Sequence, residues 1–323
     1  MSSGETSLDK KRVEPGKDYA EARMGQLSRW LTFIHERFEP VSHFIMIGLF
    51  VYAHYLVADA SKFVIIEPHL ILYVGIGTSL FFLKLRLYDE IKDFDVDVEK
   101  NPDRPLPRGL LGHFDVKRAI EFCLILEIIF FTSCGIPAFI SILFAIGYSL
   151  LMYKEFFIPK LIRPHLTTYA TSHTIVTFFL SMAIFSAFSR FNPWSMDRDF
   201  YLFGILSWLS FNIFELGRKV YQPCEEREGV DTYSSIWGKF GAFMLVFVHA
   251  IAVSALILYI STVQYFFMLK LLTVQLVFLF IIGLIYLIGK TQETGKLFRL
   301  YSSLYIVLVY TSIIINYFVR GLK

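Results

Sequence analysis

The sequence has few charged residues for its length. Asp, Glu, Lys and Arg make up 18% of its 323 residues, whereas 55% are hydrophobic. So low a charge content excludes a soluble domain of this size, whose surface would have to be far more polar. Together with a mean hydropathy of +0.54, the composition predicts an all-α, polytopic membrane protein in contact with the lipid bilayer.

Cysteine is scarce as well. The three residues (Cys123, Cys134 and Cys224) lack the spacing of a metal motif, and nothing suggests a disulfide framework. The formal net charge of +3 is too small to indicate a nucleic-acid partner. Residues 1–40 are polar and lack the apolar core and small-residue cleavage site of a secretory signal. These absences favour a membrane protein without disulfides.

Long apolar runs, by contrast, fill most of the chain. A helix needs roughly 17–25 apolar residues to cross a bilayer. Nine such windows lie at residues 41–60, 66–87, 117–134, 136–153, 165–187, 200–216, 240–261, 265–289 and 299–319. Before them, "GQLSRWLTFIHERF" has apolar residues at helical spacing and predicts a helix along the membrane surface. We therefore divide the chain into a polar tail with an interfacial helix (1–40) and a nine-helix domain (41–323).

Lysine and arginine are unequally divided between the two sides of this predicted bundle. The N-terminal segment and the regions after spans two, four, six and eight hold 25 of the 31. Since Lys and Arg gather in cytoplasmic loops, the N-terminus is predicted to be cytoplasmic. The carboxylate-rich loops after spans two and six come out on the same side, which places a candidate active site there.

The densest charge lies at the end of the second span, in "YDEIKDFDVDVEKNPDRPLPRG". Asp89, Asp93 and Asp97 recur every four residues and Glu90 precedes Asp93 by three, so a continuing helix would place them on one face. Stacked like charges repel each other. A Mg²⁺ ion, however, takes one or two carboxylates and completes its shell with water and substrate phosphate oxygens. We predict that these four carboxylates bind Mg²⁺.

Basic residues in the same segment suit a phosphate. Lys92, Arg104 and Arg108 can pair with phosphate oxygens as charge-assisted donors. The prolines of "RPLPRG" fix their φ angles and should stiffen the loop. The alternative is a solvated acidic loop, which charge runs usually form.

A second charged segment, "NIFELGRKVYQPCEEREGVDTYSSIWG", follows span six. Asn212, Glu215 and Lys219 lie about one helical turn apart and are the favoured ligands of metal or phosphate. Asp231 in "EEREGVD" is a further candidate metal ligand, with a solvated surface loop as the alternative. Because both segments follow a span on the same side, we predict two half-sites that face each other across the bundle.

The segment "GYSLLMYKEFFIPKLIRPHL" lies between these two and ends span four. Lys154 is predicted to reach the bound phosphate. Tyr148, Tyr153, Lys160 and Arg163 are further neighbours, although Lys and Arg at a membrane edge often only extend their charge to water.

Nine spans with acidic motifs after the second and the sixth resemble the UbiA superfamily of intramembrane prenyltransferases. The likeness covers residues 40–320 by architecture, and two short motifs give it specificity. The first family motif is Asn-Asp-x-x-Asp-x-x-x-Asp. Here "DEIKDFDVD" has that spacing, with Asp89 and Glu90 in the first two places, followed by Asp93 and Asp97. The downstream "DRPLPRG" is similar to the family's Arg-Pro-Leu-Pro segment.

The sequence departs from the family pattern at both motifs. Asp89 replaces the usual asparagine, and the second motif, Asp-x-x-x-Asp, is here Glu215-x-x-x-Lys219. A charged lysine cannot bind a cation, so either Asn212, Glu215 or the later acids complete the second metal site, or Lys219 supplies part of the charge directly. Lys154 lies close to the place of the family's Tyr-Pro-x-x-Lys motif.

The resemblance implies an activity. Mg²⁺ held by Glu90, Asp93 and Asp97 draws charge onto the leaving group of an isoprenyl diphosphate, and an aromatic or lipid acceptor captures the allylic cation. An apolar chamber protects that cation from water. Asp93, Lys154 and Lys219 are the candidate catalytic residues.

Three alternatives stay open. A membrane terpene cyclase of the same superfamily needs no acceptor, and a phosphoribosyl-type transferase uses a different donor. A transporter would place its charges near the bilayer midplane. The predicted span centres hold few ionisable groups, chiefly Glu127 and His173, which favours an enzyme over a transporter.

Overall fold

A computed structural model describes residues 24–61, 67–260 and 265–321, and the regular structure in these ranges is helical throughout. The elements are α2 (Gln26–Arg37), α3 (Pro40–Ala60), α4 (Pro68–Lys92), α5 (Phe94–Lys100), α6 (His113–Ser133), α7 (Ile136–Tyr153), η1 (Glu155–Phe157), α8 (Pro159–Ile162), α9 (Leu166–Thr174), α10 (Val176–Ser189), α11 (Arg198–Gly217), α12 (Tyr233–Ile260), α13 (Tyr265–Ile288) and α14 (Gln292–Gly321).

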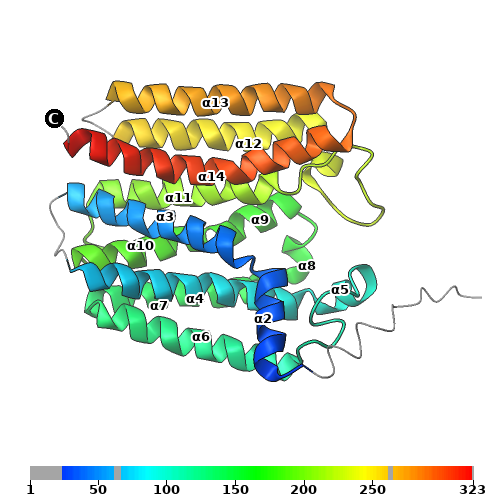
Figure 1. Ribbon diagram of the computed structural model, residues 1–323, viewed down its shortest axis with the longest axis horizontal. Coiled ribbons are helices and arrows are strands. Elements are labelled where there is room, and N and C mark those ends of the chain that lie inside the picture. Colours follow the sequence, from blue (N-terminus) through cyan, green and yellow to red (C-terminus); the bar gives the residue numbers. More distant parts are fainter. Residues whose placement is uncertain (1–23, 62–66, 261–264, 322–323) are drawn as a thin grey trace, which may run out of the picture.

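The long helices run side by side (Figure 1), and their contacts close into a ring. Each packs against the next in the order α3, α4, α6, α7, α10, α11, α12, α13 and α14, and α14 packs back on α3. Additional contacts join α10 to α3 and α11 to α14. The first and last long helices are therefore neighbours, and the bundle has no open edge between them.

Each predicted span coincides with helical structure. Eight helical segments of the described ranges are long and apolar enough to cross a membrane, and α9 and α10 together form one of them. The predicted third span is present as α6, but its window at 117–134 carries four charged residues and does not meet that criterion. The multi-pass membrane architecture is confirmed, whereas the count of nine spans and the side of the N-terminus stay predictions.

A buried ion pair explains the charge within α6. Lys84 Nζ on α4 lies 2.5 Å from Glu127 Oε2 on α6, and both side chains are fully buried. The Lys84 ammonium also lies 4.0 Å from the centre of the Phe81 ring. Two charges removed from water are tolerated only when they are paired this closely, so this contact fixes α4 against α6.

Aromatic side chains from five helices fill the centre of the bundle. Phe50 on α3 contacts the rings of Phe82 on α4, Phe211 on α11 and Tyr310 on α14, with centroids 5.5–6.4 Å apart. His54, one turn further along α3, contacts Phe185 and Phe203 on α10 and α11. Edge-to-face ring pairs of this kind pack densely. This packing gives no support to the transport alternative.

The helix predicted along the membrane surface is present as α2. In Figure 1 it crosses one end of the bundle, the end that also holds α5, α8 and the loop between α11 and α12. Its Phe33 is completely buried in a cluster with Leu87 of α4 and Leu106, whereas Leu27 and Leu31 are exposed. One face of α2 thus packs on the bundle, and the exposed residues include both apolar and polar side chains, as in a helix at a membrane surface.

Candidate functional site

The first acidic segment surrounds the break between α4 and α5. Asp93 has φ −93° and ψ 3°, which ends α4, yet its amide still donates to Asp89 O (2.9 Å), and the Asp97 amide donates to Asp93 O (2.8 Å). The three aspartates therefore stay one turn apart despite the break. Their charges also interact, because the carboxylates of Asp89 and Asp97 add to the effect of burial in raising the pKa of Asp93.

Asp93 is the least engaged of the four carboxylates that were predicted to bind Mg²⁺ (Asp89, Glu90, Asp93 and Asp97). Among the described residues it has no ion pair within 4.0 Å and no side-chain hydrogen bond, and it is half-buried. Burial first, and then the neighbouring charge of Asp89, raises the pKa of Asp93 above its usual value. A cation placed beside it would relieve both effects, so Asp93 is the side chain best suited to take a new positive partner.

Asp89 is paired with a cation already. Lys92 Nζ lies 3.1 Å from Asp89 Oδ1 and 5.4 Å from the centre of the Tyr169 ring on α9. Arg86 reaches the other carboxylate oxygen at 4.0 Å. Lys92 thus connects the end of α4 to α9, on the second half of the bundle.

Glu90 points away from these residues, toward α2. Arg37 Nε donates to Glu90 Oε1 at 2.6 Å, and the Glu90 side chain is completely buried. Arg86 approaches the same oxygen at 3.6 Å. The carboxylate predicted to bind Mg²⁺ is therefore, in this structure, the anchor of the interfacial helix.

Asp97 and the two loop arginines hold the segment 101–112 in place. Arg104 donates to both oxygens of the buried Asp97 at 2.6 Å, and Asn101 Nδ2 donates to one of them at 3.0 Å. Arg108 donates to both oxygens of Glu36 on α2 (2.8 and 3.1 Å) and to the carbonyl of Asp103. In this arrangement Arg104 and Arg108 contact carboxylates of the chain itself, although both were predicted to bind phosphate.

The second half-site lies at the end of α11. Glu215 accepts two hydrogen bonds from Arg218 (2.6 and 2.8 Å), and Lys219 Nζ lies 3.9 Å from it. Asn212 is buried, and its Oδ1 accepts a hydrogen bond from Thr174 while its Nδ2 has no partner among the described residues. Asn212 and Glu215 thus lie about one turn apart on α11, and Lys219 follows in the turn directly after the helix.

The two half-sites lie close enough to act on each other electrostatically. Burial lowers the pKa of Lys219, with Arg218 adding to the effect, while Glu215, Asp93 and Asp89 oppose it. Glu215 and then Asp89 raise the pKa of Arg218. The end of α4 and the end of α11 therefore form a single mixed cluster of carboxylates and cations.

The remaining predicted residues are placed less centrally. Lys154 is exposed, with its ammonium 5.2 Å from the Tyr153 ring, and Asp231 is exposed in the loop before α12. The acids near Asp231 stabilise that loop instead, since Glu225 pairs with Arg299 (2.6 Å) and Glu226 accepts from Thr232 (2.7 Å). For "EEREGVD" the structural role of a surface loop fits better than a ligand role.

A strained turn beside the site was not predicted from the sequence. Glu155, Phe156 and Phe157 all have positive φ (49°, 54° and 59°), a conformation that costs about 1–3 kcal/mol for each non-glycine residue. The buried Glu155 carboxylate accepts from Arg163 Nε (2.9 and 3.0 Å) and from Tyr169 OH (3.3 Å). These contacts compensate for the strain. The hydrogen bond to Glu155, and to a smaller extent the charge of Asp93, raises the pKa of Arg163.

The described residues contain no group of three or more His, Cys, Asp or Glu side chains that could hold a metal ion by themselves. The described side chains of this cluster thus do not form a complete metal-binding site by themselves. Mg²⁺ needs only one or two carboxylates when water and phosphate complete its shell, and Asp89 and Asp93 meet that requirement. The chemistry of the donor set fits an ion that binds together with a diphosphate.

The Arg37–Glu90 contact leads to a first test. Arg37→Ala is expected to lower the free energy of unfolding by about 1–3 kcal/mol, because the buried Glu90 carboxylate loses its closest donor. The measurement is denaturant unfolding of the purified protein in detergent micelles. Arg29→Ala, about two turns earlier on α2, is the matched control, because Arg29 has no ion pair among the described residues.

A double variant separates this pairing from simple loss of packing. Glu90→Gln removes the charge that Arg37 compensates, so Arg37→Ala should cost clearly less in the Glu90→Gln background. If Arg37→Ala lowered the free energy of unfolding equally in both backgrounds, the Arg37–Glu90 contact would not itself contribute to stability.

Comparison with known proteins supports the arrangement of the helices. No model of a known protein family and no curated protein sequence matches the chain. A solved structure of a digeranylgeranylglyceryl phosphate synthase is similar with a TM-score of 0.60 and 19% identity, covering 91% of this chain and 99% of that one. The apo structure of a UbiA homolog from Aeropyrum pernix K1 gives a TM-score of 0.57 and 12% identity, over 85% and 98%. At these identities the likeness concerns the fold.

Proposed function

We propose that this chain, which has the fold of a UbiA homolog, is an intramembrane prenyltransferase of the UbiA superfamily. It transfers a prenyl group from an isoprenyl diphosphate to a hydrophobic aromatic or lipid acceptor and releases diphosphate. The observation that carries the proposal is the mixed cluster, in which Asp93, without an ion pair among the described residues, interacts electrostatically with Asp89 and with cations of two other segments, Arg163 and Lys219.

The cations of the cluster suit a departing diphosphate. Lys92, Arg218 and Lys219 come from the ends of two helices that the fold brings together, and Arg163 adds a third segment. Positive groups fixed in advance stabilise charge that develops on a leaving group. When the allylic C–O bond breaks, its electron pair leaves with the diphosphate. The acceptor then forms the new bond to the prenyl carbon and loses a proton.

Mg²⁺ is the cofactor of this proposal, and it would neutralise the diphosphate and favour its departure. Asp89 and Asp93 are the residues that would hold it. Glu90 and Asp97 support the site through Arg37 and Arg104, and Asn212 and Glu215 are the remaining candidates for a second ion. The face on which the reaction takes place is proposed to be cytoplasmic, as the distribution of Lys and Arg predicts.

Diphosphate release by the purified protein tests the proposal. We expect release from a long-chain allylic diphosphate in the presence of Mg²⁺ and a suitable acceptor, and none after chelation with EDTA. Adding back Mg²⁺ after chelation controls for damage to the protein. Release without an acceptor, with formation of a cyclic hydrocarbon, would identify a cyclase instead. If no donor in an allylic series gives Mg²⁺-dependent release, the proposed activity is wrong.

A further inference from the structure

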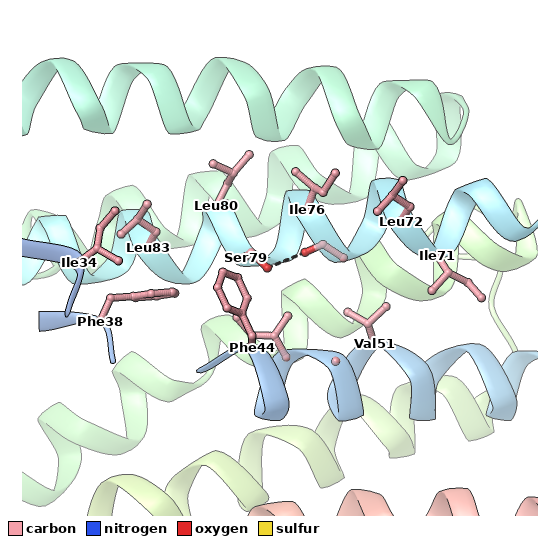
Figure 2. Close-up of a pocket in the computed structure, with 13 residues that line it drawn as sticks. Ile34, Phe38, Phe44, Val51, Ile71, Leu72, Ile76, Ser79, Leu80 and Leu83 are labelled. Carbon is pink, nitrogen blue, oxygen red and sulfur yellow. Dashed lines mark hydrogen bonds between the residues drawn. The ribbon is translucent and has the colours of Figure 1, made fainter. Parts of the chain in front are cut away.

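Two grooves lie against α2, on either side of α4. The larger, of about 780 Å³, lies between α3 and α4, and Figure 2 shows that its lining is apolar apart from Ser79. A lining of this kind does not distinguish one apolar occupant from another. The smaller, of about 430 Å³, lies between α2, α4 and α6 and has a charged end as well as an apolar one. The smaller groove therefore contains groups that can select a partner.

The lining of the smaller groove changes from polar to apolar along α6. This helix begins at His113, at the end of the bundle that α2 crosses (Figure 1). Asp115 and Arg118 are the first residues of α6 that line the groove, and Phe122 follows one turn after Arg118. From α4, leucines line the groove. The polar end of the groove thus lies at the end of the bundle, and the apolar end extends toward its middle.

The groove opens onto an exposed apolar stripe of α6. Phe114, Phe122, Ile125 and Ile129 recur at helical spacing, and each is more than half exposed. On a membrane protein, an exposed apolar stripe is a surface for the acyl chains of the bilayer. Phe122 belongs to this stripe and also lines the groove. An acyl chain that lies along the stripe can therefore enter the groove without leaving apolar surroundings.

One cation lies within this stripe. Arg118 is exposed, lines the groove, and lies one turn from both Phe114 and Phe122. Its guanidinium is 4.7 Å from the Phe114 ring, and it has no ion pair within 4.0 Å among the described residues. The planar guanidinium can donate two parallel hydrogen bonds to the oxygens of a phosphate. Arg118 is therefore available to a phosphate at the edge of the apolar stripe.

Two further donors come from α2. Gln26 and Trp30 line the groove one turn apart, and neither side chain has a hydrogen bond within the described part of the chain. Tryptophan rings gather at the head-group level of membranes. The lining carboxylate of Asp115 is already engaged, since its Oδ2 accepts a hydrogen bond from the Gly112 amide (3.0 Å). The polar end of the groove thus offers one unpaired cation and two neutral donors to an anion.

We propose that the groove between α2, α4 and α6 binds one anionic phospholipid of the surrounding leaflet. The lipid phosphate binds Arg118, and an acyl chain covers Phe122 and the leucines of α4. A free phosphate leaves the apolar walls uncovered, a diacylglycerol leaves Arg118 without a partner, and a zwitterionic lipid brings a second cation to Arg118. Because the lipid contacts Trp30 and Arg118 at once, it fastens α2 to α6. This role goes beyond the proposed transfer reaction and does not depend on it.

A lipid titration of the purified full chain in dodecyl maltoside micelles tests the inference. Dioleoyl phosphatidylglycerol is expected to raise the thermal unfolding midpoint until the site is saturated. Arg118→Gln should raise the lipid concentration for half-maximal stabilisation about tenfold, as when one charge-assisted contact is lost. Lys117→Gln is the matched control, because Lys117 is also exposed but does not line the groove. It should bind the lipid as the native protein does.

Fluorescence quenching locates the bound lipid. Phosphatidylglycerol with brominated acyl chains quenches an indole ring that it contacts, and part of this quenching should disappear in Trp30→Phe. The same part should require about tenfold more lipid in Arg118→Gln. Quenching that is identical in the native protein and in Trp30→Phe would place the lipid outside the groove and overturn the inference.

Three other ligands and the control variant provide the remaining outcomes. Dioleoyl phosphatidylcholine, dioleoylglycerol and inorganic phosphate are each expected to stabilise the protein less than phosphatidylglycerol. Equal stabilisation by any of them would overturn the assignment of an anionic phospholipid. Equal losses in Arg118→Gln and Lys117→Gln would show general attraction to surface charge and would overturn the site. Since no readout involves turnover, these results are separate from the test of the proposed activity.

Discussion

Asp93→Asn is expected to abolish turnover while the protein stays folded in detergent. The loss should be at least on the order of 10²–10³-fold, as when one group that stabilises developing charge is removed. Asparagine keeps the size of the side chain but can neither balance a cation nor hold Mg²⁺ by its charge. Because Asp93 has no ion pair among the described residues, its replacement leaves no buried cation without a partner.

Asp95→Asn is the control for this substitution. Asp95 belongs to the same acidic segment but is exposed, so its replacement changes the net charge equally and should leave turnover within about twofold, as for surface positions generally. Turnover and the thermal unfolding midpoint are measured on both variants. Near-normal activity of Asp93→Asn would refute the assignment of the metal and diphosphate to this cluster.

Lys84→Met is expected to destabilise the bundle by about 3–5 kcal/mol, because it leaves the Glu127 carboxylate buried without a counter-charge. The free energy of unfolding in mixed micelles is the measurement. Lys84→Met combined with Glu127→Leu removes both charges and should recover most of the loss. A double variant as unstable as the single one would show that packing volume, and not charge, makes this contact important.

Lys296→Met provides the matched comparison on the surface. Lys296 and Glu293 also form an ion pair at 2.9 Å, but their side chains are 50% and 77% exposed. Exposed pairs contribute about 0–1 kcal/mol, so this variant should be nearly as stable as the native protein. The contrast between the two lysines isolates the effect of burial.

The transmembrane helices could be predicted from the sequence because their signal is local. A bilayer span needs a continuous apolar run, and eight of the nine windows lie in helices with one, whereas the window at 117–134 carries four charged residues. The break between α9 and α10 was not predicted, because the sequence predicts one continuous span over residues 165–187, although α9 is rich in Thr, Ser and His and only α10 is strongly apolar. The sequence shows that Glu127 lies within the predicted third span, but it does not show that Lys84 on α4 is its partner, because the two residues are 43 positions apart.

The sequence indicated which residues gather at the candidate site better than it indicated which partners they contact. The fourfold spacing singled out Asp89 and Asp93, which the fold brings near the second charged segment. The role of Glu90 depends on Arg37, 53 residues earlier, and spacing carries no information about a pair so distant. The same holds for Arg108 and Glu36, 72 residues apart. Arg218, in contrast, was detectable in principle, because it follows Glu215 by one helical turn.

The crossing of α2 over the bundle end is expected to make the candidate site sensitive to bilayer thickness. Leu27 and Leu31 of α2 are exposed and available to the bilayer, while Arg37 and Glu36 tie the same helix to Glu90 and to the Arg108 loop. A thinner or thicker hydrocarbon layer shifts an interfacial helix relative to the spans at a cost of fractions of a kcal/mol per ångström. Through the Arg37–Glu90 contact such a shift would act on the carboxylates at the end of α4, so the geometry of the candidate site is expected to depend on lipid composition.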